Sequence, residues 1–211
     1  MLDQNAESKQ SSTNWNGANS SSTTAGNADW YCYRLAETYL LRVETKFYNG
    51  DPVRAAADVN EVRKRAQCER LYNTVTIGDI VDERARELYM EEWRYMELSR
   101  ISYCLALSGK SDEFGNTYNP ETYDKQEGTD ANGGSYWYQR IVHYNDFYNK
   151  NPKLLVKNRA YAIDKYNLYL PIPQSAIDAN RLGKLRQNYG YNGYDETIPM
   201  WETWEEAEAN N

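Results

Sequence analysis

The stretch from Tyr31 to Ala66 most constrains the fold, because its apolar residues recur with the period of two consecutive α-helices. The first row of apolar side chains is Cys32, Ala36, Leu40, Val43 and Phe47. The second row is Ala55, Val59, Val62 and Ala66. Steps of three and four residues place each row on one face of a helix. The pattern therefore predicts a helical hairpin.

The break between the two rows carries the residues that end one helix and begin another. Gly50 can take the left-handed conformation that ends the first helix, Asp51 can accept bonds from free N–H groups of the second, and Pro52 suits its first turn. Two helices joined in this way, the second rich in alanine, are typical of a tetratricopeptide-type unit. Such units bind or scaffold more often than they catalyse, so we expect this chain to present a surface.

Length and charge exclude several classes of protein. The 211 residues suit one domain with a real core, and the net charge of −7 argues against a nucleic-acid partner. No apolar run approaches the ~20 residues of a transmembrane helix. The residues after Met1 lack the basic start and apolar core of a signal peptide, so we expect any export signal of the mature protein to lie upstream.

The aromatic residues are biased towards those with a polar group. There are 20 Tyr and 6 Trp but only 3 Phe. Rings that also carry an O–H or N–H suit sugars, which combine C–H faces with hydroxyls. The alternative is that most of these tyrosines fill half-buried positions of a polar helical protein.

The chain divides into three parts. We predict a Ser/Asn-rich loop or disordered lead-in over residues 1–29, a helical domain over 30–194 and an acidic tail over 195–211. Cys32 and Cys68 fall at the same end of the hairpin, where a disulfide is geometrically conceivable, although buried free thiols are the preferred interpretation.

We predict that the third helix is one long helix from Ile77 to Leu107, capped by Thr76 and Asp79, with Trp93 in the core. Beyond it the chain turns loop-rich. The later predicted elements are a helix over Tyr136 to Tyr148, a short extended pair within Arg159 to Leu170, and a helix over Gln174 to Asn180 capped by Ser175. The fold class is therefore all-α.

Four segments in order resemble the C-terminal half of the SusD/RagB family of Bacteroidetes outer-membrane nutrient-binding lipoproteins. The first is Asp29-Trp30 followed by Arg34 to Leu41 (Arg-Leu-Ala-Glu-Thr-Tyr-Leu-Leu), and the second is Gly50-Asp51 followed by Ala55 to Ala66, which ends in Asn-Glu-Val-Arg-Lys-Arg-Ala. The third is Glu83 to Arg100 (Glu-Arg-Ala-Arg-Glu-Leu onwards), and the fourth is Pro171 to Asn180 with Gln187 to Tyr191 (Pro-Ile-Pro to Gln-Asn-Tyr-Gly-Tyr). Three positions depart from the family pattern: Glu92 stands for a Gly, Glu97 for an Asp and Tyr189 for a Pro. The family's N-terminal half and lipid-bearing cysteine are not in this sequence, so we expect a fragment.

The resemblance implies a function as well as a fold. It implies non-catalytic capture of a glycan or oligosaccharide at the bacterial cell surface and delivery to a SusC-like TonB-dependent transporter. It further implies attachment to the outer membrane through a lipid anchor on the missing N-terminal segment. A helical-repeat scaffold that binds another protein is the alternative, and a carbohydrate-active hydrolase is the third hypothesis.

Loop aromatics with polar neighbours are the candidates for glycan contact, because sugars need both a ring face and hydrogen-bond partners. They are Trp15, Trp30, Tyr136, Trp137 and Tyr138. The alternative for each is a hydrophobic plug that holds a loop against the helices. In the family, loops of both halves are implied to build the site, so this chain would hold only part of it.

The charged residues of the third predicted helix allow two interpretations. Glu87 and Glu91 share one face, which allows the interpretation of a metal or catalytic pair, but no histidine accompanies them. We instead predict a structural ion-pair network of Arg34, Glu37, Glu87, Glu91 and Arg94. His143 is the only histidine and no nucleophile motif or Cys/His cluster occurs, so we expect no catalytic residue, no metal and no cofactor.

Overall fold

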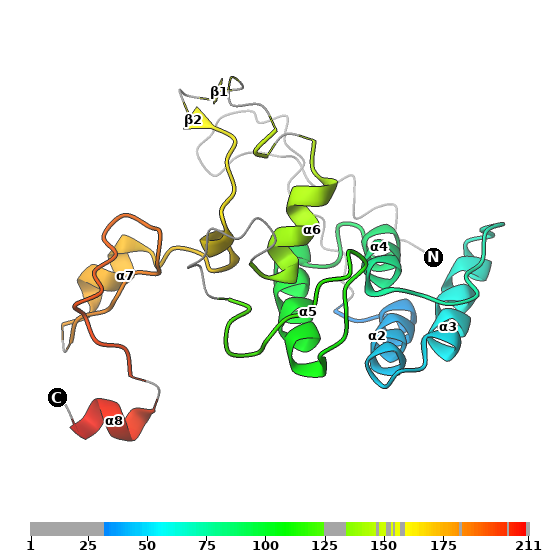
Figure 1. Cartoon of the computed structure of the whole chain (residues 1–211), viewed down its shortest axis with the longest axis horizontal. Helices are drawn as coiled ribbons and strands as arrows, with labels where there is room; N and C mark the ends of the chain where they lie inside the picture. The colour runs from blue at the N-terminus through cyan, green and yellow to red at the C-terminus, as the bar shows by residue number, and fades with distance from the viewer. Residues whose placement is uncertain are drawn as a thin grey trace, which may run out of the picture.

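The computed structural model describes residues 32–124, 134–146, 148–150, 153, 155–156, 159–181, 183–201 and 203–209. Its helices confirm the all-α class (Figure 1). They are α2 (Leu35–Tyr48), α3 (Pro52–Arg65), α4 (Ile77–Glu87), α5 (Arg94–Ser108), α6 (Tyr136–Tyr144), the 3₁₀ helix η1 (Lys165–Leu168), α7 (Gln174–Ala179) and α8 (Trp204–Ala209). The predicted lead-in over 1–29 lies outside the described residues.

The predicted hairpin is confirmed as α2 and α3, which pack side by side (Figure 1). Gly50 has a φ of +81°, the left-handed conformation expected after α2. The Asp51 side chain accepts the Arg54 N–H at 3.0 Å, and Pro52 is the first residue of α3. The turn therefore forms for the local reasons that the sequence indicates.

The prediction of one long third helix is wrong, because the structure divides this segment into α4 and α5. The start is as predicted: Thr76 and Asp79 form a reciprocal capping box. The chain then leaves the helix after Glu87, and Met90 takes a φ of +65°. Eight residues of continuous helix would span ~12 Å. The turn instead lets Glu92 fold back to 2.7 Å from Arg84.

The break changes which side chains of the later helix face the core. Trp93 was expected in the core, but it precedes α5 and is 80% exposed. Met96, Tyr103 and Leu107, three further large apolar side chains of this segment, are exposed as well. The helical phase is reset at the turn, so the face of α5 that packs inward is the one carrying Leu98, Ile101 and Leu105.

One hydrophobic core joins α2 to η1. Its buried members are Val43, Ala55, Ala56, Val59, Val75, Ile77, Ile80, Val81, Leu98, Ile101, Leu105, Tyr136, Trp137, Ile163 and Leu168. In Figure 1, α5 and α6 lie together beside α4 and the hairpin. The α6 helix ends earlier than predicted, at Tyr144, because Asn145 has extended backbone and bonds its side chain back to the Ile141 carbonyl at 2.7 Å.

The C-terminal part is built from short elements. The extended pair is β1 (Leu155–Val156) with β2 (Arg159–Ala160), antiparallel with Leu155 opposite Ala160, so it begins before the predicted range. The predicted Ser175 cap of α7 is wrong, since the N-cap position is Pro173, whose side chain has no polar atom to accept a backbone N–H. Figure 1 shows α7 and α8 at the opposite end of the molecule from the hairpin.

Candidate functional site

Tyr136 and Trp137 lie in the core and present no ring face to solvent. Trp137 is 2% exposed, its backbone N–H donates to the Ser102 hydroxyl at 2.7 Å, and its ring meets Tyr95 edge to face at 5.5 Å. The Tyr136 hydroxyl donates to Glu113 at 3.2 Å, and burial raises its pKa. Their proposed role as glycan platforms is therefore corrected to a packing role. The sequence signal for this was Ser135, which caps α6. The cap places both rings in the first turn of a helix and not in a loop.

Of the three other aromatic candidates, the structure describes only Tyr138. Tyr138 is half-buried in α6, where burial raises its pKa, and its ring contacts the side of the core. Trp15 and Trp30 lie outside the described residues.

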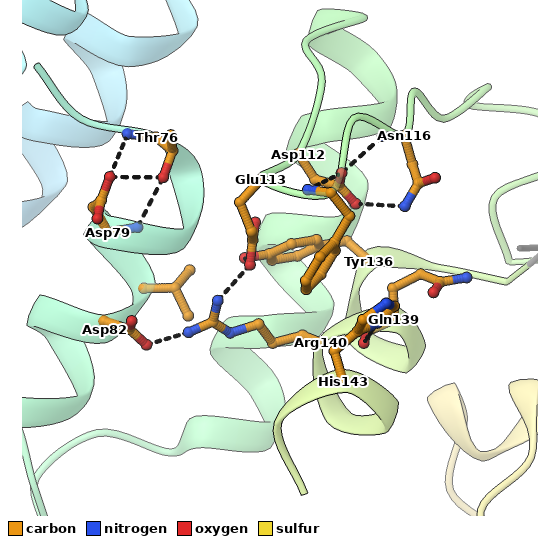
Figure 2. Close-up of polar contacts among 12 residues, drawn as sticks. Thr76, Asp79, Asp82, Asp112, Glu113, Asn116, Tyr136, Gln139, Arg140 and His143 are labelled. Atoms are coloured by element: carbon orange, nitrogen blue, oxygen red, sulfur yellow. Dashed lines mark hydrogen bonds and ion pairs between the residues drawn. The ribbon is translucent and has the colours of Figure 1, made fainter.

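Arg140 ties three elements together beside these rings (Figure 2). Its guanidinium pairs with Asp82 of α4 and with Glu113 of the loop after α5, and it stacks on the Tyr144 ring at 3.9 Å. The same loop is closed by Asp112, which accepts the backbone N–H groups of Phe114 and Asn116. These contacts fix α6 against α4, which is a structural role.

His143 belongs to this structural group. Its Nδ1 lies 2.8 Å from the Gln139 carbonyl oxygen, one turn earlier in α6, and its ring stacks on Phe114 at 4.0 Å (Figure 2 shows the first pair). Neither partner is a nucleophile. Among the described residues, no group of three or more His, Cys, Asp and Glu could hold a metal ion.

The structure brings three residues of the predicted ion-pair network into contact. Arg34, just before α2, pairs at 2.5 Å with both Glu87 and Glu91, and it also donates to the Glu87 backbone carbonyl. Arg94 does not join them. It lies 3.5 Å from Glu92 and donates to the Val81 carbonyl oxygen at 2.9 Å, and burial lowers its pKa. Glu37 lies nearby, and burial raises its pKa against the opposing charge of Arg84.

Sequence reasoning missed the centre of this charged region, which is Arg84. The residue is 0% exposed, and its guanidinium lies 2.7 to 3.3 Å from carboxylates of Glu44, Glu92 and Glu97. Arg100 of α5 pairs with Glu44 of α2 and with Glu97, three residues earlier in α5. The position of Arg84 along the helix could have predicted its burial. It follows Ile80 and Val81 by four and three residues and so faces inward with them.

Burial dominates the electrostatics of Glu44, the acid shared by two arginines. Burial raises its pKa, while the charges of Arg100 and Arg84 act to lower it. A buried carboxylate is costly unless it is paired. The two guanidiniums therefore explain how an acid can occupy the interface of α2, α4 and α5.

A hollow of about 460 Å³ opens above this network, between the start of α2 and the α4–α5 turn. Two exposed aromatic residues line it, Tyr33 at 77% and Trp93 at 80% exposed. Four acidic residues line it too: Glu37, Glu91, Glu92 and Glu97. Its remaining lining residues are Cys32, Arg34, Leu88 and Met96. Volume and mixed polarity both suit a small-molecule or oligosaccharide site.

The cysteines and the helix lengths complete the description. Cys32, Cys68 and Cys104 are free thiols, as preferred for the first two, but neither of these two is buried: Cys32 is exposed and Cys68 is half-buried. Burial raises the pKa of the Cys104 thiol. None of the described helices has the length and apolar character needed to cross a bilayer.

Comparison with known proteins places this architecture in a family. The model of the SusD family matches residues 8–191. A segment of 81 residues, 38% of this chain, is 44% identical to the starch-binding protein SusD of Bacteroides thetaiotaomicron. That segment covers only 14% of the SusD protein, so the chain spans a small share of its relative. The family match extends over most of the sequence, and the chain belongs to the SusD family.

Proposed function

We propose that this chain is part of a cell-surface protein that binds a glycan without cleaving it and delivers it to a TonB-dependent, SusC-like transporter. The observation that carries the proposal is membership of the SusD family over residues 8–191. The relative at 44% identity is named a starch-binding protein, which supports a carbohydrate ligand. Attachment to the outer membrane would be through a lipid anchor on a segment beyond this chain.

The physical character of the molecule supports binding over catalysis. The mostly buried side chains of Glu44, Glu83 and Glu92 each lie within ion-pair distance of an arginine. A glycoside hydrolase needs one carboxyl that donates a proton and a second that attacks or activates water. These three acids are engaged in contacts that hold elements of the fold together. Trp15, Trp30 and Tyr138 remain proposed contacts of the ligand.

The test is a binding and hydrolysis assay on the purified chain. Soluble starch, xylan, mannan and pectin are titrated into it by calorimetry, and reducing ends are measured in parallel after prolonged incubation. We expect heat of binding with at least one polysaccharide and no reducing ends. Absence of binding to the whole panel would count against glycan capture. Sugar release that disappears on substituting one carboxylate would replace it with hydrolysis.

A protein-binding scaffold is the second candidate, and one feature of the hairpin favours it. A hollow of about 380 Å³ lies on the α2–α3 hairpin, lined by Leu35, Ala36, Tyr39, Glu61, Val62 and Arg65. Tetratricopeptide-type hairpins commonly bind peptides on such surfaces. A scaffold should co-purify in the absence of sugar with a protein partner other than the transporter, and Leu35→Asp should abolish that association while leaving glycan binding unchanged.

A further inference from the structure

Trp93 is placed where a ligand, not the core, would contact it. Its side chain is 80% exposed although it stands between two well-ordered helices. Tryptophan is highly buried on average, so a large exposed ring at the edge of a hollow indicates a binding role. Tyr33 lines the same hollow and is nearly as exposed. Two ring faces at one opening can contact the C–H faces of a sugar chain.

The carboxylates beside the rings are held in place by the network beneath them. Glu91 uses its Oε2 to accept from Arg34 at 2.5 Å, and its side chain remains 39% exposed. Glu97 is oriented by Arg84 and Arg100 at 3.1 and 2.7 Å. Acceptors fixed in this way lose little rotational freedom when they bind sugar hydroxyls. The hollow therefore combines aromatic faces with preorganised acceptors.

The charge of the lining decides which sugars the hollow can accept. Four carboxylates line it, and Arg34 is the one cation among its described lining residues. Each of the three guanidinium nitrogens of Arg34 already donates to Glu87 or Glu91. A sulfated or uronic-acid sugar would meet four carboxylates of its own sign, and the one opposing charge, that of Arg34, is already paired with Glu87 and Glu91.

On the basis of the proposed function, we propose that this hollow is a subsite for an uncharged oligosaccharide. Trp93 and Tyr33 are its stacking platforms, and Glu91 and Glu97 accept hydrogen bonds from sugar hydroxyls. The site differs from every aromatic candidate that the sequence indicated, since the tertiary structure alone brings Tyr33 and Trp93 to one opening.

The experiment measures calorimetric affinity of the whole chain for neutral probes, namely maltoheptaose, xylohexaose, mannohexaose and cellohexaose. Trp93→Ala and Tyr33→Ala are compared with wild type for whichever probe binds. Trp204→Ala is the matched control, because that ring is also exposed, at 71%, but belongs to α8 at the far end of the chain. We expect about a tenfold loss of affinity for Trp93→Ala, a smaller loss for Tyr33→Ala and a change below about twofold for the control.

A second experiment tests the charge of the ligand by comparing the binding of dextran and dextran sulfate of equal chain length. We expect dextran sulfate to bind no better than dextran, and Glu37→Gln with Glu91→Gln to increase its binding. Tighter binding of the sulfated polymer to wild type would overturn the assignment of an uncharged ligand.

The outcomes separate this inference from the proposed function. If wild type binds a neutral probe and Trp93→Ala binds it equally well, the subsite is wrong while glycan capture stands. If wild type binds none of the neutral probes but binds another glycan of the polysaccharide panel, the subsite again fails alone. If Trp93→Ala leaves glycan affinity unchanged but turns a dimer into a monomer in gel filtration, the patch is a self-association surface. Circular dichroism is the control for folding of the variants. We expect them to fold, because the substituted rings are exposed.

Discussion

The helical part, α2 to α6, and the C-terminal part, from residue 161 to 209, are held together by different chemistry. The helical part buries a continuous apolar core and surrounds it with ion pairs such as those of Arg84. The C-terminal part buries few apolar side chains, and α7 and α8 bury none. Side-chain amides and hydroxyls hold it instead. The Gln187 amide, for example, accepts from the Ile172 N–H and donates to the Ile172 carbonyl.

Tyrosines close the C-terminal part around these amide bonds. Tyr191 donates its hydroxyl to the Tyr169 carbonyl at 2.9 Å, and its ring meets Tyr166 edge to face at 5.2 Å. Such contacts are directional but each contributes only about 1 kcal/mol. The comparison teaches that the tyrosine bias has a structural origin here, since rings with a polar tip replace a core. We therefore expect the C-terminal part to open locally before the helices unfold.

The largest effect should come from Arg84→Ala. Removal of the guanidinium leaves the buried Glu44 and the partly buried Glu92 and Glu97 with reduced compensation, which costs about 3–5 kcal/mol. Urea unfolding monitored by circular dichroism measures the free energy. Arg86→Ala is the control, because its side chain is 51% exposed, and should cost less than about 1 kcal/mol.

A compensated variant sharpens this test. Arg84→Met combined with Glu44→Gln and Glu92→Gln removes charge on both sides, and we expect it to regain much of the lost stability. If it is no more stable than Arg84→Ala, the loss came from packing and not from unpaired carboxylates.

The next effect concerns the apolar core of the helical part. Leu105→Ala, at a fully buried position of α5, should lose about 3 kcal/mol through lost burial and the cavity left behind. Leu107→Ala two residues later is exposed and should change stability by less than about 0.5 kcal/mol. Equal losses in urea unfolding would contradict the phase that the α4–α5 break sets.

A pair of glycines tests the C-terminal part. Gly190 has a φ of +82°, and a Cβ there would lie 2.4 Å from the Tyr166 ring, so Gly190→Ala should cost about 2 kcal/mol. Gly193 has a similar φ of +88° but open space around it, so Gly193→Ala should pay only the backbone strain of about 1 kcal/mol. Hydrogen exchange should locate the loss for Gly190→Ala between residues 166 and 191. Faster exchange spread equally over α2 to α5 would show that the two parts unfold together.

The smallest effect lies at the solvent side of the hairpin. Burial acts to raise the pKa of Asp58, but hydrogen bonds from Arg42 and Lys46 outweigh it and hold the pKa below its ordinary value. Because the folded pKa is lowered, this stabilisation is complete above ~3.9, the pKa in the unfolded chain, and is lost as pH falls through the folded pKa. Asp58→Asn should cost about 1 kcal/mol at pH 7 and progressively less as the pH is lowered through the folded pKa of Asp58. A cost that does not change with pH would exclude the ion pairs as its cause.

Local sequence rules predicted much of the fold. The Gly50, Asp51 and Pro52 turn and the Thr76 capping box depend on neighbours within four residues, so their side chains determine them directly. The α4–α5 break was not predictable from helix periodicity, because no glycine or proline marks it. The ion pair of Arg84 with Glu92, eight positions apart, accompanies the break. Trp93 was placed in the core for the same reason, since its predicted phase assumed an unbroken helix.

The sequence by itself determined the all-α class, the hairpin and the family, because these follow from the spacing of apolar residues, from helix caps and from short motifs. The tertiary structure decided which aromatic residues face solvent. It buried Trp137 beside Ser102 and exposed Trp93 next to Tyr33, although these two lie 60 positions apart. Exposure of a ring depends on what packs against it from distant segments, and that is a property of the folded chain.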